Sequence, residues 1–296
     1  MRSYLWFLAV IVGTLLVAAL LSYPLFLLIH SLAPTLRFDK IATRLWQLLM
    51  LLTLVLVVRR LRLYSTRDFG YGAPRPRWLR QFGKGLALGV TTMVPVTVSL
   101  LALGVRVPRA DLGALALGGV LLSAALSGLA VAFVEETFFR GLMQGAVVRD
   151  LQRPMLAVVL VAVVYASVHF LASTHIPPEA VRWSSGFDLL ATALRNFAHP
   201  AGILDAWLAL LSVGVLLGFA AWWTGNIALG VGLHAGWVFI MRATVGATGA
   251  DVTAPRHWLV NPDNGFLGWL VLAWTLLLLV VVVLSRDRFR AWRRGY

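Results

Sequence analysis

The stretch LLSAALSGLAVAFVEETFFRG, residues 121–141, determines the fold class predicted for this chain. It is apolar up to two adjacent glutamates, Glu135 and Glu136, and Arg140 follows them after about one helical turn. An apolar run of about 20 residues is long enough to cross a bilayer as a helix. A charge near the centre of such a helix costs about 2.5–3.5 kcal/mol, so these three charges indicate a functional site within the membrane.

The composition extends this prediction to the whole chain. Of its 296 residues, 60% are hydrophobic and 13% are charged, and the mean hydropathy is +0.84, which is typical of membrane proteins. Apolar runs this long lack the alternation of barrel strands, so helices are the spanning elements. We expect an all-α polytopic membrane protein of about eight transmembrane helices, with the catalytic site inside the helical bundle. The expected spans are 4–29, 41–58, 82–105, 112–139, 155–172, 204–223, 226–243 and 265–285.

The basic residues indicate the orientation of the chain. Its net charge is +14, but Lys and Arg are concentrated between the apolar runs. There they meet membrane lipids with anionic head groups, so we expect no nucleic-acid partner. With the N-terminus inside, sixteen of the 26 basic residues lie on the inner side and nine on the outer side. We therefore expect a multi-pass protein of the bacterial inner or plasma membrane with both termini cytoplasmic.

Three regions are expected along the chain: an N-terminal three-helix membrane region with a basic cytoplasmic loop (1–110), a catalytic core (111–245), and a C-terminal transmembrane helix with a basic tail (246–296). The basic loop, 59–84, is rich in Gly and Pro and is expected to be a solvated connector. The longest outer loop, 173–203, either covers the site or has no role. It contains His175, Glu179, Asp188 and His199.

The residue types limit the chemistry. The chain has no cysteine, which excludes disulfides, thiolate nucleophiles and Cys-based zinc sites. It has no Gly-rich phosphate loop, no His-Glu-x-x-His pair and no Gly-x-Ser-x-Gly elbow. Catalysis must therefore use oxygen or imidazole groups.

Helical spacing assigns different roles to the two carboxylates. Glu136 and Arg140 are four residues apart on one face, which predicts an ion pair. Glu135 is turned about 100° away and has no partner on its own helix. A desolvated carboxylate without a partner is suited to act as a general base.

Two histidines on other helices are candidate partners of Glu135. His169 follows the expected helical turn near Leu151 by 18 residues and Glu135 precedes it by 16, so the two are nearly level at about 1.5 Å per residue. His234 lies eight residues beyond Asn226, and is level with them only if the preceding turn is recessed or the helices tilt. Each histidine alone could equally join two helices by a hydrogen bond.

The groups together favour an enzyme over a purely structural cluster. Two other functions stay open at this point. One is a proton-coupled membrane transporter that uses the carboxylate and imidazoles as a relay. The other is a catalytically weak membrane scaffold or immunity protein on the same fold.

The motifs resemble those of the CPBP family of intramembrane proteases, which includes the CAAX prenyl protease 2 (Rce1-type) and Abi-like proteins. The family's Glu-Glu-x-x-x-Arg reads Glu135-Glu136-Thr-Phe-Phe-Arg140 here. Its Phe-x-x-x-His reads Tyr165-Ala-Ser-Val-His169, and its His-x-x-x-Asn reads His234-Ala-Gly-Trp-Val238. The resemblance covers roughly 115–245, in the family's order.

The resemblance implies an intramembrane endopeptidase that cuts a CAAX-type or other membrane-associated peptide, or a membrane-protein substrate. In it, Glu135 and His169 would activate a water and His234 would stabilise the oxyanion. Glu136 and Arg140 would hold the site or contact the substrate. Whether the mechanism is of the glutamate type or metal-dependent stays open, because Glu135, His169 and His234 could also bind Zn. The residues expected to bind substrate are Phe139, Tyr165 and Val238.

Val238 departs from the family pattern. It replaces an Asn whose amide would be an oxyanion donor, and the loss of one such donor costs about 10²–10³ in rate. Asn226, Thr224 and Tyr165 are the alternative donors that the sequence offers.

Overall fold

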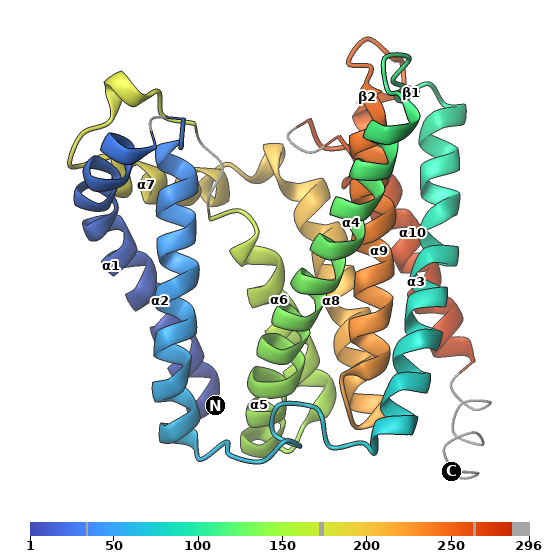
Figure 1. Cartoon of the computed structure of the whole chain (residues 1–296). Helices are drawn as coiled ribbons and strands as arrows, with labels where there is room; N and C mark the ends of the chain where they lie inside the picture. Colours follow the sequence, from blue (N-terminus) through green and yellow to red (C-terminus); the bar gives the residue numbers. More distant parts are fainter. Residues whose placement is uncertain (34, 172–174, 263–264, 286–296) are drawn as a thin grey trace.

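The computed structural model describes residues 1–33, 35–171, 175–262 and 265–285. Within them the chain is almost entirely helical, with one short two-stranded ladder (Figure 1). A π-helix, η1 (Glu136–Met143), joins α4 to α5 without a break. The α-helices are α1 (Arg2–Leu32), α2 (Phe38–Leu61), α3 (Arg75–Ala102), α4 (Ala114–Glu135), α5 (Gln144–Leu151), α6 (Pro154–Val168), α7 (Ser185–Ala198), α8 (Leu204–Thr224), α9 (Ala228–Ala247) and α10 (Trp269–Leu284). Short 3₁₀ turns lie at Pro178–Ala180, Pro200–Gly202 and His257–Leu259.

The helical membrane architecture is confirmed, but the count of eight spans is not. Six helical segments in the described part of the chain are long and apolar enough to cross a membrane: α1, α2, α3, the segment from α4 through α5, α8 and α9. The other two predicted spans correspond to α6 and α10, which are apolar but only 15 and 16 residues long. They extend about 22 and 24 Å against a hydrocarbon core of about 30 Å.

The predicted span 112–139 ends too early, because the helix continues to Leu151. The polar residues Arg140 and Gln144 do not end this helix, because α8 provides hydrogen-bond acceptors for both side chains. Arg140 donates to the carbonyl of Gly214 (3.3 Å) and Gln144 to that of Gly218 (2.8 Å). Polar side chains with partners on a neighbouring helix are compatible with a spanning segment.

The predicted span 155–172 ends too late. Helix α6 stops at Val168, and residue 172 lies outside the described residues. The N–H of Phe170 bonds to the carbonyl of Ser167 and that of Leu171 to Val168, each three residues back. Such tightened bonds satisfy the last carbonyls and end a helix.

Helix α9 is held between α3 and α4 by contacts at glycines (Figure 1). A Cβ at Gly85 or Gly89 of α3 would overlap a backbone carbonyl of α9, and one at Gly232 of α9 would overlap a carbonyl of α3. On the other side, a Cβ at Gly128 of α4 would lie 2.9 Å from the carbonyl oxygen of Ala235. Small residues allow this close approach of backbones in membrane helices, and they fix the axis of the helix that carries His234.

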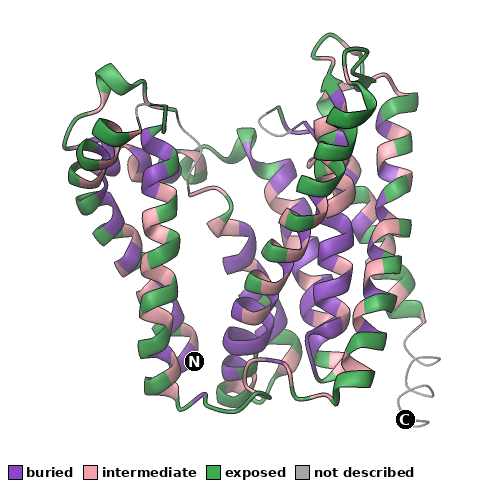
Figure 2. Cartoon of the chain, in the orientation of Figure 1, coloured by how far each residue is buried: buried purple, intermediate pink, exposed green. Residues whose placement is uncertain are grey.

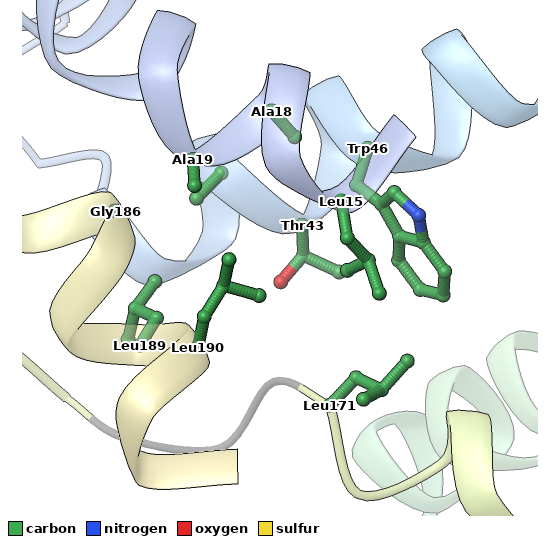
Figure 3. A pocket seen from close by; sticks show the side chains of 10 residues that line it. Leu15, Ala18, Ala19, Thr43, Trp46, Leu171, Gly186, Leu189 and Leu190 are labelled. Atoms are coloured by element: carbon green, nitrogen blue, oxygen red, sulfur yellow. The ribbon is translucent and has the colours of Figure 1, made fainter. Parts of the chain in front are cut away.

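The outer loop 173–203 is not structureless, because it contains α7. This helix packs on α1, where Gly186 meets the backbone of Ala19, and Leu189 joins the apolar cluster of the α1–α2 hairpin. An apolar cavity of about 30 Å³ lies between the three helices, lined partly by Leu15, Trp46 and Leu189 (Figure 3). The described part of the loop therefore packs against the α1–α2 hairpin.

The opposite ends of the molecule carry different connections (Figure 1). The N-terminus and the connector between α2 and α3 lie at one end; α7 and the ladder lie at the other. The ladder pairs β1 (Arg106–Pro108) with β2 (Thr248–Ala250) in antiparallel register, Val107 opposite Gly249. Arg106 is buried and donates to the carbonyls of Thr248 (2.9 Å) and Gly265 (2.7 Å), which joins these outer segments.

Exposed side chains on the outward helix faces are largely Leu and Val, whereas α8, α9 and η1 are mostly buried (Figure 2). An apolar outer surface around a buried centre is what a bilayer requires, because lipid chains cover it in place of water.

Candidate active site

The two carboxylates occupy a change of helix type. Glu135 is the last residue of α4 and Glu136 is the first of the π-helix η1. Single π turns inside α-helices are rare and occur frequently at functional sites. Glu136 forms the predicted ion pair with Arg140, with Oε1 and Nη1 3.0 Å apart and both side chains fully buried.

Glu136 also binds the first imidazole. Nδ1 of His234 lies 3.0 Å from Oε1 of Glu136, so one carboxylate oxygen contacts both a guanidinium and an imidazole. The guanidinium of Arg140 lies over the ring of Tyr165, 4.2 Å from its centroid. A buried charge pair is stabilised by such additional partners, which here come from α6 and α9.

Glu135 lies between the two histidines. Its Oε2 is 3.9 Å from Nε2 of His169 and 3.9 Å from Nε2 of His234. The side chains of Glu135 and His169 are 25% and 29% exposed, whereas that of His234 is 5% exposed. As predicted, Glu135 and Glu136 have different partners. His169 also lies level with Glu135 across the α5–α6 turn, as the count of residues predicted. The site is therefore accessible on its Glu135–His169 side and closed on its His234 side.

The turn before α9, which precedes His234, is packed inside the protein. Asn226 and Ile227 in this turn are buried. The side chain of Asn226 accepts from the N–H of Ala228 (2.9 Å) and donates to the carbonyl of Thr224 (3.1 Å). His234 lies close to Glu135, with Nε2 3.9 Å from Oε2, so the two residues are level in the bundle.

The hydrogen bonds of the imidazoles assign their tautomers. Nδ1 of His169 lies 2.7 Å from the carbonyl oxygen of Tyr165, and a carbonyl only accepts, so Nδ1 carries a proton. Nδ1 of His234 likewise donates to Glu136. In the neutral rings both Nε2 atoms then present lone pairs to Oε2 of Glu135, which itself has no hydrogen-bond partner although it is buried. Three acceptors that converge in this way require a proton donor between them.

The residues expected to bind substrate are all buried. Phe139, Tyr165 and Val238 are 5%, 2% and 9% exposed. Phe139 packs edge-to-face on Tyr165 (5.3 Å), which packs edge-to-face on His169 (4.7 Å). Phe139 and Tyr165 thus pack in series against the ring of His169, and contact of the three residues with substrate stays a prediction.

Two of the alternative oxyanion donors are already engaged elsewhere. Thr224 donates its hydroxyl to carbonyls of α8 and its turn, and Asn226 holds the same turn. Tyr165 has its ring beside both imidazoles, with centroids 4.7 and 6.3 Å away, and its side chain interacts with Glu135.

Several residues around the site were missed from the sequence. Gly230 lies one turn before His234, and a Cβ there would lie 3.0 Å from Oε2 of Glu136; its spacing from His234 was an available signal. Thr137 accepts a hydrogen bond in the first turn of η1 from Tyr71 (2.7 Å), a residue of the connector. No sequence pattern predicts that contact.

The zinc alternative finds no support in this geometry. Within the described part of the chain, no group of three or more His, Cys, Asp or Glu side chains is arranged to hold a metal ion.

Comparisons with known proteins agree with the site. Searches of curated proteins and of solved structures each found no significant match. Residues 117–240 match the profile described as type II CAAX prenyl endopeptidase Rce1-like. This segment runs from α4 into α9 and includes every residue of the site. Residues 117–240, which are less than half of the chain, are thus similar to the Rce1-like family, which is of the CPBP type.

Proposed function

We propose that the protein is an intramembrane endopeptidase that hydrolyses a peptide bond of a CAAX-type or other membrane-associated peptide. The single observation that carries the proposal is the position of Oε2 of Glu135, 3.9 Å from Nε2 of both His169 and His234. A water between these atoms has acceptors for both of its protons and is held by groups from three helices.

The first step is the attack of this water on the substrate carbonyl. The water oxygen forms a bond to the carbonyl carbon while its proton passes to Glu135, and the carbonyl electrons move to the oxygen. His169 orients the water through Nε2, since its Nδ1 is fixed by the carbonyl of Tyr165. General-base help of this kind contributes about 10²–10⁴ in rate.

The second step returns the proton. The C–N bond breaks, and the leaving amine takes the proton from Glu135. We assign the stabilisation of the oxyanion to His234, whose Nδ1 is held by Glu136 and whose Nε2 faces the reacting atoms. We assign the hydroxyl of Tyr165 as the second donor, because Val238 has none and the turn residues are engaged.

The exposure of the site indicates from which side a substrate peptide approaches and in which conformation. Glu135 and His169 are partly exposed, whereas Phe139, Tyr165 and Val238 are buried. A peptide therefore approaches from the Glu135–His169 side, with its carbonyl carbon next to the water and its oxygen toward His234. An extended segment suits this approach, because a helical peptide bond is shielded by its own hydrogen bonds.

The test is peptide cleavage by the purified protein in liposomes. Prenylated CAAX peptides and unprenylated membrane-anchored peptides serve as substrates, and products are identified by mass spectrometry. Glu135→Gln should lower kcat by at least about 10²-fold, because an amide cannot accept the proton, while the melting temperature stays within about 2 °C of wild type.

The matched control is Glu179→Gln, the same change at an exposed residue of a 3₁₀ turn outside the site. This variant should cleave like wild type. Turnover by Glu135→Gln at the wild-type rate would rule out the general-base assignment. Gradient-driven peptide uptake without cleavage would instead favour a transporter, and neither activity would favour a scaffold.

A further inference from the structure

The connector between α2 and α3, residues 62–74, packs against the helices of the site. The sequence suggested a solvated loop, but Gly70 is buried and its carbonyl accepts from the N–H of Ile227 (3.0 Å), at the start of α9. Gly70 has φ +85°, a backbone conformation that favours glycine. A Cβ there would lie 2.5 Å from Cγ2 of Ile227.

A second backbone contact joins the connector to the π-helix. Gly141 lies in η1, and a Cβ at this position would overlap the carbonyl of Phe69. A third contact is electrostatic: Asp68 lies 3.4 Å from Nη1 of Arg149 on α5. Burial alone would raise the pKa of Asp68, but hydrogen bonds from Ser65 and the charge of Arg149 hold this pKa below its usual value. The connector thus contacts η1, α5 and α9.

Tyr71 makes the contact nearest to the catalytic carboxylates. Its hydroxyl lies 2.7 Å from Oγ1 of Thr137, the residue that follows Glu136. Thr137 donates its own proton to the carbonyl of Phe133 (2.6 Å), so Tyr71 is the donor of the pair. The ring of Tyr71 is stacked on Trp78 (5.9 Å), which is stacked on Phe133 (5.8 Å). The donor is therefore held by its ring as well as by its hydroxyl.

The bond acts at the junction of two helix types. At this point α4 ends and the wider π turn begins, so the usual pattern of helical hydrogen bonds changes at Glu136. Glu136 in turn positions Nδ1 of His234, whose Nε2 faces Glu135. The hydrogen bond from Tyr71 to Thr137 thus holds the residue next to Glu136. Glu136 contacts His234, and His234 faces Glu135, the proposed general base.

We propose that Tyr71 is a positioning residue of this site, which acts through Thr137 and Glu136 on His234. The proposal rests on the proposed endopeptidase function for its kinetic readout. Tyr71 contacts neither Glu135 nor the histidines in the hydrogen bonds and ion pairs of the described residues. Its loss should therefore change the rate of the chemical step and leave substrate binding unchanged.

The kinetic test is Tyr71→Phe, which removes the hydroxyl and keeps the stacked ring. We expect kcat to fall about 3- to 10-fold, the size of one hydrogen bond, with KM within about twofold of wild type. Tyr64→Phe is the matched control, because the hydroxyl of Tyr64 donates to the carbonyl of Arg59 and its side chain is exposed in the same connector. It should retain wild-type kcat.

A second pair of variants separates positioning from stability. Thr137→Ser keeps the acceptor hydroxyl and should retain activity, whereas Thr137→Val should lose it to the extent that Tyr71→Phe does. The double variant Tyr71→Phe/Thr137→Val should lose no more than either single variant, because both remove the same bond. Additive losses, or a lower melting temperature with unchanged kcat, would overturn the proposal.

A readout independent of cleavage distinguishes this proposal from the proposed function. The ring ¹⁵N signals of His234 report on its bond to Glu136, and they should shift in Tyr71→Phe but not in Tyr64→Phe. If wild type cleaves no peptide and these signals still shift, the endopeptidase function fails and the positioning role holds. If wild type cleaves and neither kcat nor the signals change, only the positioning role fails.

Discussion

At the scale of single residues, two neighbouring glutamates have different surroundings. The spacing of Glu136 and Arg140 was enough to predict their ion pair, because that contact is local. Counting from the α5–α6 turn was enough to place His169 level with Glu135. The bond from His234 to Glu136 could not be predicted, since it depends on how α9 is placed relative to α4 and η1.

Gly230→Ala tests the space around Glu136. The new Cβ would lie 3.0 Å from Oε2 of Glu136, so the carboxylate must move by a few tenths of an ångström and shift the hydrogen bond to His234. The change also raises helix propensity by about 1 kcal/mol, so the variant should fold normally but lose about tenfold in kcat. Cleavage assays and thermal unfolding measure the two effects.

The control for this variant is Gly145→Ala on α5, where a Cβ would meet nothing within 4 Å. It should keep wild-type activity with equal or higher stability. Equal kcat for Gly230→Ala and wild type would show that the carboxylate of Glu136 has freedom to move.

At the scale of elements, the sequence predicted long apolar helices well and their ends poorly. Periodicity cannot distinguish the π turn of η1 from the α-helix around it, because the choice depends on the packing of Arg140 and Gly141 against α8 and the connector. It also missed α7, whose residues pack on α1 along one face only. Local sequence predicts a helix when its apolar run is long, and α7 has no such run.

The glycine contact between α3 and α9 is the element-scale prediction. In Gly85→Ala the Cβ would overlap the carbonyl of Leu229, and a backbone atom cannot yield without separating the helices. Overpacking of this kind costs about 1–3 kcal/mol, so we expect a melting temperature lower by roughly 2–10 °C. Thermal unfolding in detergent or in liposomes is the measurement.

Gly83→Ala, two residues earlier on α3, provides the comparison, because a Cβ there meets nothing within 4 Å. Its melting temperature should equal or exceed that of wild type. If Gly85→Ala were as stable as Gly83→Ala, close backbone contact would not be what positions α9.

At the scale of the whole molecule, composition was sufficient to predict a multi-pass helical membrane protein. It was insufficient for the number of crossings, because α6 and α10 are apolar but short. Composition also gave a wrong prediction for the connector between α2 and α3, because its Gly and Pro content is typical of a solvated loop. Burial of Gly70 against α9 is a tertiary contact that composition does not encode.

The distribution of Lys and Arg predicts an orientation in the membrane with both termini inside, and this prediction can be measured directly. The chain has no cysteine, so a single introduced cysteine is its only thiol. Thr66→Cys lies in the connector and Val252→Cys lies just after β2, and both positions are exposed. In right-side-out vesicles, a membrane-impermeant maleimide should label Val252→Cys and not Thr66→Cys. Labelling in the reverse order would place the N-terminus outside.

The π-helix has a further consequence, which concerns chain length. Because its hydrogen bonds span five residues instead of four, η1 contains one residue more than an α-helix over the same arc. If the same residues were wound as an ordinary α-helix, without the wider turn, α5 would be rotated by about 100° relative to α4. Asp150 of α5, which accepts from the N–H of Ser3 (2.6 Å), would then face away from the N-terminus. The number of residues in this turn sets the rotational phase between the catalytic carboxylates and the first helix of the chain.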